Sequence, residues 1–241
     1  MLPLCRMQQK KVEQLIETAR RKMKKSKDPI HDLSHVERVV QYTKDFSCQL
    51  DLTDEQKNAL LLAAWWHDMA RTITRRPSIV WMSFIDDTLS AVMLWVKTIQ
   101  LGLFGGVVGL ATRLIFSKSF GTGFLFTRIC LKKKNRILLD ILQDADQFDL
   151  FHRERMQRIK QMATSSKIYL WGYKLTAWWF LSAHKIKFKT NAAKACFKKI
   201  LRALTHWILS KNICTWHLET FGIHWCEKTL LRIQRLQNTF I

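Results

Sequence analysis

Acidic residues are scarce in this chain of 241 residues, which holds 19 aspartates and glutamates against 40 lysines and arginines. Proline and glycine are scarce too, with three and eight copies. So few turn-forming residues argue against a strand-rich sandwich or barrel. Leu, Ile, Lys, Arg, Gln and Ala dominate instead, and these residues favour helices. We therefore predict an all-α fold.

The sequence also lacks long apolar runs and paired cysteines. Its first residues include no apolar stretch of the secretory type. The longest uncharged run, residues 98–112, is shorter than the roughly 20 apolar residues that span a bilayer. The six cysteines form no C-x-x-C pair, and we interpret them as reduced thiols. We expect a cytoplasmic protein, with association at a membrane surface as the alternative.

The excess positive charge lies at the two ends of the chain. Residues 1–27 carry nine basic and two acidic side chains, and residues 28–151 carry fourteen of each. Residues 152–241 carry seventeen basic side chains against three acidic ones. Cationic flanks raise the affinity for nucleic acid or anionic lipid without sequence selectivity, although basic helices that merely face water have the same composition.

Three segments place histidine or aspartate at the edge of an apolar helical pattern. They are HDLSHVERV at 31–39, WWHDMAR at 65–71 and ILQDADQFD at 141–149. If the three helices converge, two imidazoles and two carboxylates form a mixed nitrogen and oxygen site. That donor set suits Mn²⁺, Fe²⁺, Co²⁺, Ni²⁺ or Zn²⁺ better than Ca²⁺ or Mg²⁺, which prefer oxygen. The spacing alone leaves open the alternative that these histidines are ordinary core or surface residues.

The order of these segments resembles the HD-domain superfamily of metal-dependent phosphohydrolases. The resemblance covers roughly residues 10–165 and depends on HVERV, HDMAR and DADQFD in that order. It implies an HD-domain-like helical bundle with its metal ligands on facing helices around one cleft. It also implies one divalent metal ion (Mn, Fe, Co, Ni or Zn, with Mg allowed) and hydrolysis of a phosphate ester or anhydride of a small molecule such as a nucleotide.

The resemblance assigns the metal ligands residue by residue. The first ligand is His35, which opens HVERV. His67 and Asp68 are the pair that gives the family its name. The distal ligand is Asp146, with Asp144 as the alternative.

Catalytic roles beside the metal are expected for Asp68 and for three cations. Arg71 lies one turn after the histidine of HDMAR, where its guanidinium would hold a phosphate oxygen and offset charge in the transition state. Arg38 lies three residues after His35 in HVERV. Its guanidinium would also hold a phosphate oxygen, or it would pair with a core carboxylate. Lys118 lies in IFSKSF, where other branches have a histidine pair, and is expected to contact phosphate.

The sequence departs from the pattern of some HD-domain branches in two ways, and both narrow the activity and the number of metal ions that the resemblance implies. Some nucleotidase branches use a glutamate at the position of Arg71 to assist the attacking water, and this chain lacks it. Branches with two metals have further histidines between the HD pair and the distal aspartate, whereas residues 69–145 contain none. We therefore expect a single metal ion. The motifs do not identify a particular substrate.

The last part of the chain combines tryptophan with basic charge. Six of the ten tryptophans lie beyond residue 170, namely Trp171, Trp178, Trp179, Trp207, Trp216 and Trp225. Cationic helices with aromatic residues suit a membrane interface, and they also suit single-stranded nucleic acid. The third interpretation is that the aromatic side chains pack on the rest of the protein. We expect residues 1–165 to form the HD-type domain and residues 166–241 a basic, Trp-rich helical extension packed on it.

Two functions are consistent with these patterns. The first is a phosphohydrolase that acts on a phosphorylated small molecule through a metal-activated water. The alternative is a catalytically weak HD-fold protein that docks on anionic membrane or nucleic acid through its basic tail. The segment CTWHLETFGIHWC at 214–226 matches no zinc-finger spacing that would suggest a third function.

Overall fold

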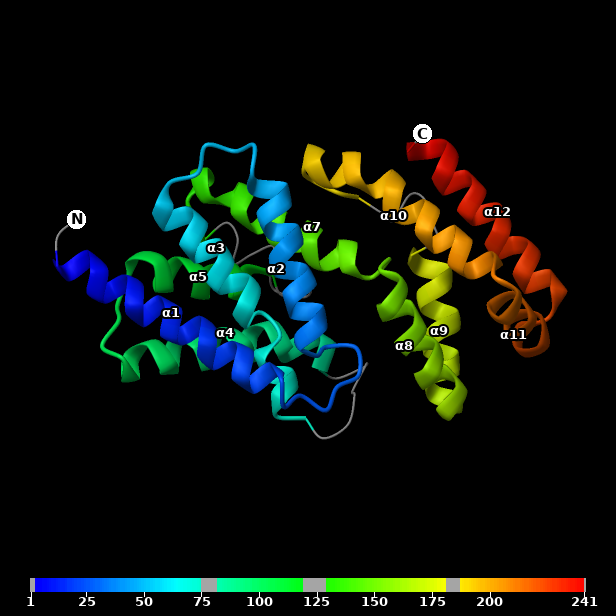
Figure 1. Ribbon diagram of the computed structural model, residues 1–241, viewed down its shortest axis with the longest axis horizontal. Coiled ribbons are helices and arrows are strands. Elements are labelled where there is room, and N and C mark those ends of the chain that lie inside the picture. The colour runs from blue at the N-terminus through cyan, green and yellow to red at the C-terminus, as the bar shows by residue number, and fades with distance from the viewer. Residues whose placement is uncertain (1–2, 75–81, 119–128, 181–186, 241) are drawn as a thin grey trace. The chain divides into compact units, whose positions relative to one another are not determined.

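The computed structural model confirms the all-α fold. It describes residues 3–74, 82–118, 129–180 and 187–240. Within these ranges every regular element is a helix (Figure 1), and no helix there has the length and apolar character needed to cross a bilayer. The chain divides into two compact units, residues 1–146 and 147–241.

The first unit is built around one central helix. Its elements are α1 (Pro3–Met23), α2 (Leu33–Ser47), α3 (Asp54–Trp66), the 3-10 helix η1 (Met69–Thr72), α4 (Met82–Gln100), α5 (Gly106–Lys118), the 3-10 helix η2 (Lys133–Asn135) and most of α7 (Arg136–Asp149). Helix α3 packs against α1, α2, α4 and α5. Its buried residues include three alanines, whose small side chains let neighbouring helices approach closely.

Hydrogen bonds near both ends of α3 hold this helix in place. Thr53 is the N-cap: its hydroxyl accepts a hydrogen bond from the backbone N–H of Gln56, and the Gln56 side chain accepts one from the backbone N–H of Thr53. Near the other end, the indole N–H of Trp66 donates to the Leu15 carbonyl of α1 over 3.1 Å. The residues that follow Trp66 are therefore held at a defined place in the core.

In its described residues, the second unit contains the end of α7 and five further helices. These are α8 (Arg153–Ser165), α9 (Lys167–Phe180), α10 (Asn191–Leu209), α11 (Lys211–Phe221) and α12 (Ile223–Phe240). The side chains of Trp178 and Trp179 lie outside the described part of α9. Helix α8 packs along α9, and α10 packs against α8, α11 and α12. The division between the units therefore falls within α7 and not at the expected boundary after residue 165, because α8 is paired with α9.

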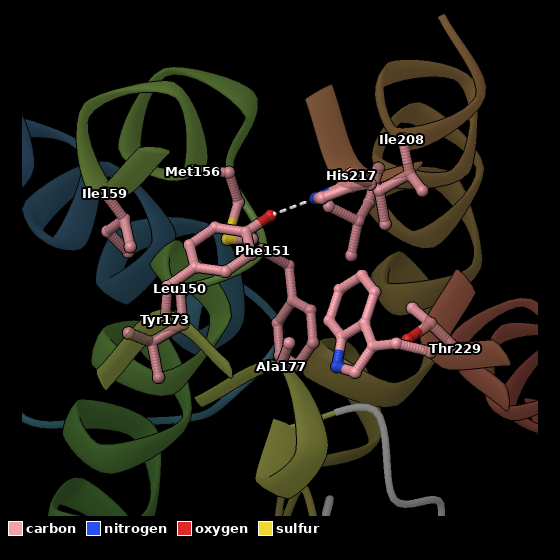
Figure 2. Close-up of a pocket in the computed structure, with 11 residues that line it drawn as sticks. Leu150, Phe151, Met156, Ile159, Tyr173, Ala177, Ile208, His217 and Thr229 are labelled. Carbon is pink, nitrogen blue, oxygen red and sulfur yellow. Dashed lines mark hydrogen bonds between the residues drawn. The ribbon is translucent and has the colours of Figure 1, made fainter. Parts of the chain in front are cut away.

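The second unit encloses a small apolar pocket of about 30 Å³ (Figure 2). Across it, the Tyr173 hydroxyl lies 2.8 Å from Nε2 of His217. Burial lowers the pKa of His217 to about 4, and the nearby Lys160 contributes in the same direction. His217 is therefore a neutral, hydrogen-bonded core residue at neutral pH.

We expect the second unit to lose stability as the pH falls from about 6.5 to about 4. In this range the unfolded chain, with an ordinary histidine pKa of 6.5, binds a proton that folded His217 does not bind. The loss has an upper limit of about 3 kcal/mol in the free energy of unfolding. Urea unfolding at several pH values measures it. The variant His217→Gln should flatten this part of the profile, and an unchanged profile in that variant would contradict the assignment.

Candidate metal centre

The four expected metal ligands come from three separate segments of the first unit. His35 lies in the first turn of α2, where its backbone N–H donates to the N-cap Asp32 over 3.1 Å. His67 and Asp68 directly follow the last residue of α3, and Asp146 lies in α7. Both histidine side chains are fully buried, whereas the Asp146 side chain is 25% exposed. The candidate site is thus buried on the histidine side and reaches solvent at Asp146.

The donor atoms of these residues face one another. The two Nε2 atoms of His35 and His67 are 3.3 Å apart. Oδ1 of Asp146 lies 3.5 Å from Nε2 of His35 and 3.8 Å from Nε2 of His67. With bonds of about 2.0–2.2 Å, neighbouring ligands of one ion lie roughly 2.8–3.6 Å apart. His35, His67 and Asp146 could therefore hold a metal ion with only small movements.

Asp68 lies against the same two imidazoles. Its Oδ2 atom is 3.1 Å from Nε2 of His35 and 3.4 Å from Nε2 of His67. This oxygen is buried and makes no hydrogen bond of good geometry. Burial opposes ionisation of Asp68, but the surrounding histidines outweigh it and hold its pKa well below the usual range. A buried carboxylate oxygen enclosed by two imidazoles is a position where a bound cation would be stabilised.

A hydrogen bond at Nδ1 determines which ring nitrogen of His67 carries the proton. Nδ1 lies 2.8 Å from the backbone carbonyl of Ala64. Because a carbonyl oxygen only accepts hydrogen bonds, Nδ1 carries the proton and Nε2 presents its lone pair to the cluster. Burial lowers the pKa of His67 and outweighs the opposing charges of Asp68 and Asp146. A neutral imidazole oriented by a backbone carbonyl is the usual state of a metal-binding histidine.

Lys118, at the C-terminal end of α5, lies beside the cluster. Its Nζ is 2.8 Å from Oδ2 of Asp146 and 3.1 Å from Oδ1 of Asp87. Burial alone would raise the pKa of Asp146, but the Lys118 ammonium and the histidines lower it far below its ordinary value. Burial raises the pKa of Asp87 to about 7, with Lys118 opposing the rise and Asp86 adding to it. Of the two carboxylates beside Lys118, Asp146 is therefore the charged one, as a metal ligand must be.

The two arginines of the motifs have protein partners. Arg71 is 3% exposed and donates from Nη2 to Asp86, while its Nη1 lies 3.9 Å from Oδ2 of Asp28. This guanidinium connects η1 to α4 and to the segment before α2. Arg38 is half-buried and donates to the Ser34 hydroxyl of its own helix over 3.3 Å.

Three aspartates near the site were not found from the sequence. Asp86 and Asp87 lie in α4, and Asp28 lies in the loop before α2; all three are buried. The available signal was the pair of adjacent carboxylates in the mostly apolar helix α4. The alternative distal ligand, Asp144, is also fully buried, but the group of side chains that could hold an ion contains Asp146 in its place.

Comparisons of the chain with protein-family models, with curated proteins and with solved structures find no match. The resemblance to HD-domain phosphohydrolases therefore depends on the motif residues alone.

Proposed function

We propose that this protein is an HD-type phosphohydrolase with one divalent metal ion, held by His35, His67, Asp68 and Asp146. The observation that supports this most strongly is the convergence of two imidazole nitrogens with two carboxylates, at 3.1–3.8 Å between nitrogen and oxygen. The residues come from segments far apart in the chain, and a structural ion pair would not need two histidines facing each other.

The donor set and its surroundings favour a transition metal over Ca²⁺. Imidazole with carboxylate suits Mn²⁺, Fe²⁺, Co²⁺, Ni²⁺ or Zn²⁺. When bound, such an ion lowers the pKa of a coordinated water to about 7, which supplies hydroxide for attack on phosphorus at neutral pH. The chain itself orients the ligands: the Ala64 carbonyl holds the ring of His67, and Lys118 holds the second oxygen of Asp146.

Lys118 is the cation best placed to act on a phosphorylated substrate. Its side chain is 11% exposed, and its ammonium contacts the ligand Asp146 directly. Burial disfavours its charge, but Asp146 and Asp87 raise its pKa well above the usual value, so it stays protonated. A fixed positive charge beside the ion would offset negative charge that develops on the phosphate oxygens. Arg71, which is buried with Asp86, is the weaker candidate for this role.

Phosphate release tests this proposal. The full chain, loaded with Mn²⁺, Co²⁺ or Ni²⁺, should hydrolyse p-nitrophenyl phosphate or a nucleotide in a metal-dependent reaction. Lys118→Gln should weaken metal binding by about 10–100-fold, because Lys118 orients Asp146, and at saturating metal it should lower turnover by about 10²–10³-fold. Lys118→Arg, which keeps the charge, should lose less. A protein that binds one ion per chain but releases no phosphate from any of these substrates would contradict the hydrolase proposal.

The second candidate function is binding of an anionic surface, with little or no catalysis. The observation that favours it is the net positive charge of residues 152–241, which contain seventeen basic side chains and three acidic ones. Such a surface attracts phosphate-bearing partners whether or not the metal centre turns over a substrate. Catalysis and surface binding involve different residues, so one chain can have both.

A further inference from the structure

A groove between α9 and α12 brings cations and tryptophans together. Its lining includes Trp171, Lys174 and Leu175 from α9, and Trp225, Lys228 and Arg232 from α12. The groove has a volume of about 260 Å³, far more than the roughly 30 Å³ that one water occupies in the liquid. None of the described residues that line it is acidic. The groove therefore suits an anionic group attached to an apolar body.

The outer face of α9 next to this groove is apolar and exposed. Ile168 is 75% exposed, Trp171 is 66% exposed and Leu175 is 46% exposed. Spacings of three and four residues place these side chains on one face of the helix. Lys167 and Lys174 are exposed beside them. Large apolar side chains that are grouped on one face, and not scattered singly, indicate a contact surface.

We propose that α9 and the facing side of α12 dock on the surface of an anionic phospholipid bilayer. Lys174, Lys228 and Arg232 would meet the lipid phosphates, since basic side chains near such a surface are attracted by its negative potential. The apolar side chains of α9 would enter the boundary between headgroups and acyl chains, as in other interfacial amphipathic helices.

The aliphatic residues favour a membrane over single-stranded nucleic acid. Nucleic-acid grooves use successive aromatic side chains on which bases stack. Here Trp171 is the more exposed of the two groove tryptophans, and its neighbours on the exposed face are Ile168 and Leu175. Aliphatic side chains do not stack on bases, but they gain free energy when they leave water for acyl chains. None of these residues belongs to the metal centre, so the inference is independent of the proposed hydrolysis.

Vesicle binding by the full chain tests the surface directly. The protein should bind vesicles of phosphatidylcholine mixed with phosphatidylserine and should not bind vesicles of phosphatidylcholine alone. Lys174→Gln/Lys228→Gln should weaken binding about 25-fold, because each basic residue near an anionic surface contributes about fivefold. The matched control is Lys194→Gln/Lys199→Gln on α10, which removes the same charge from two exposed residues outside the groove. It should change binding less than about threefold, since neither lysine lines the groove.

The apolar contribution is tested with Trp171→Ala/Leu175→Ala, which should weaken vesicle binding by about tenfold or more. Both side chains are largely exposed, so the helical circular dichroism and the metal content should match those of the wild type. Equal losses in the two lysine pairs would overturn the proposal, because binding would then follow net charge alone. Unchanged vesicle binding in the apolar variant would also overturn it, as would a single-stranded oligonucleotide that displaces the protein from vesicles.

Discussion

Replacement of His67 or Asp68 by alanine is expected to abolish metal binding. The wild type should hold about one transition-metal ion per chain when it is supplied with Mn²⁺, Co²⁺ or Ni²⁺. Each variant removes one donor from a cluster in which Nε2 of His67 lies 3.4 Å from Oδ2 of Asp68. The affinity should fall by more than about 100-fold, because even outer partners of metal ligands contribute about 10–100-fold. Elemental mass spectrometry of the purified proteins measures the metal content.

Two aspartates of α7 provide a matched control for this result. Asp146→Asn should lose the metal, whereas Asp144→Asn makes the same change two residues away and should retain it. The reason is that Oδ1 of Asp146 lies 3.5 and 3.8 Å from the Nε2 atoms of the two histidines and belongs with them to the group of side chains that could hold an ion. The opposite result would make Asp144 the distal ligand. Absence of metal from the wild type after incubation with all three ions would contradict the metal centre itself.

Replacement of Arg71 by methionine is expected to destabilise the first unit by about 3–5 kcal/mol. The buried guanidinium pairs with Asp86 and lies near Asp28, and both carboxylates are buried as well. Methionine fills much of the same space but leaves Asp86 without its cation, whereas Asp28 keeps its contact with His31. Urea unfolding, followed by circular dichroism, measures the free energy of unfolding.

A second variant separates lost charge pairing from lost packing. Arg71→Met/Asp86→Leu should recover part of the stability, because a buried ion pair replaced on both sides by apolar residues is often nearly neutral. Arg38→Met should cost less than about 1 kcal/mol, since its hydrogen bond to Ser34 is local and half-buried. If Arg71→Met keeps full stability and loses only phosphate turnover, the catalytic role implied by the HDMAR motif is correct and the structural role is wrong.

Several features of the fold were predictable because they depend on local sequence. The scarcity of proline and glycine predicted the all-α fold. The start of α3 depends on Thr53 and Gln56, which lie three residues apart in the chain and exchange hydrogen bonds. The apolar helical pattern before His67 lies in α3, which packs against α1, α2, α4 and α5. Helix propensity, capping and burial of a central helix are all encoded within a few consecutive residues.

The partners of the charged residues were not predictable in the same way. Lys118 was expected near phosphate, but its pairing with Asp87 and Asp146 joins residues from three helices. Arg71 was expected at the catalytic centre, and its pairing with Asp86 depends on how η1 lies against α4. A motif identifies the residue type that a site needs, whereas the distance between two side chains depends on helix packing.

The sequence by itself determined the helical class and the residues that were candidates for a metal centre. Only the tertiary structure decided that His35, His67 and Asp146 converge, that Arg71 is neutralised in the core, and that α8 belongs with the second unit. The physical reason is that an amphipathic pattern specifies which face of a helix is buried but not which neighbour buries it. That choice depends on side-chain packing and charge pairing across the whole unit.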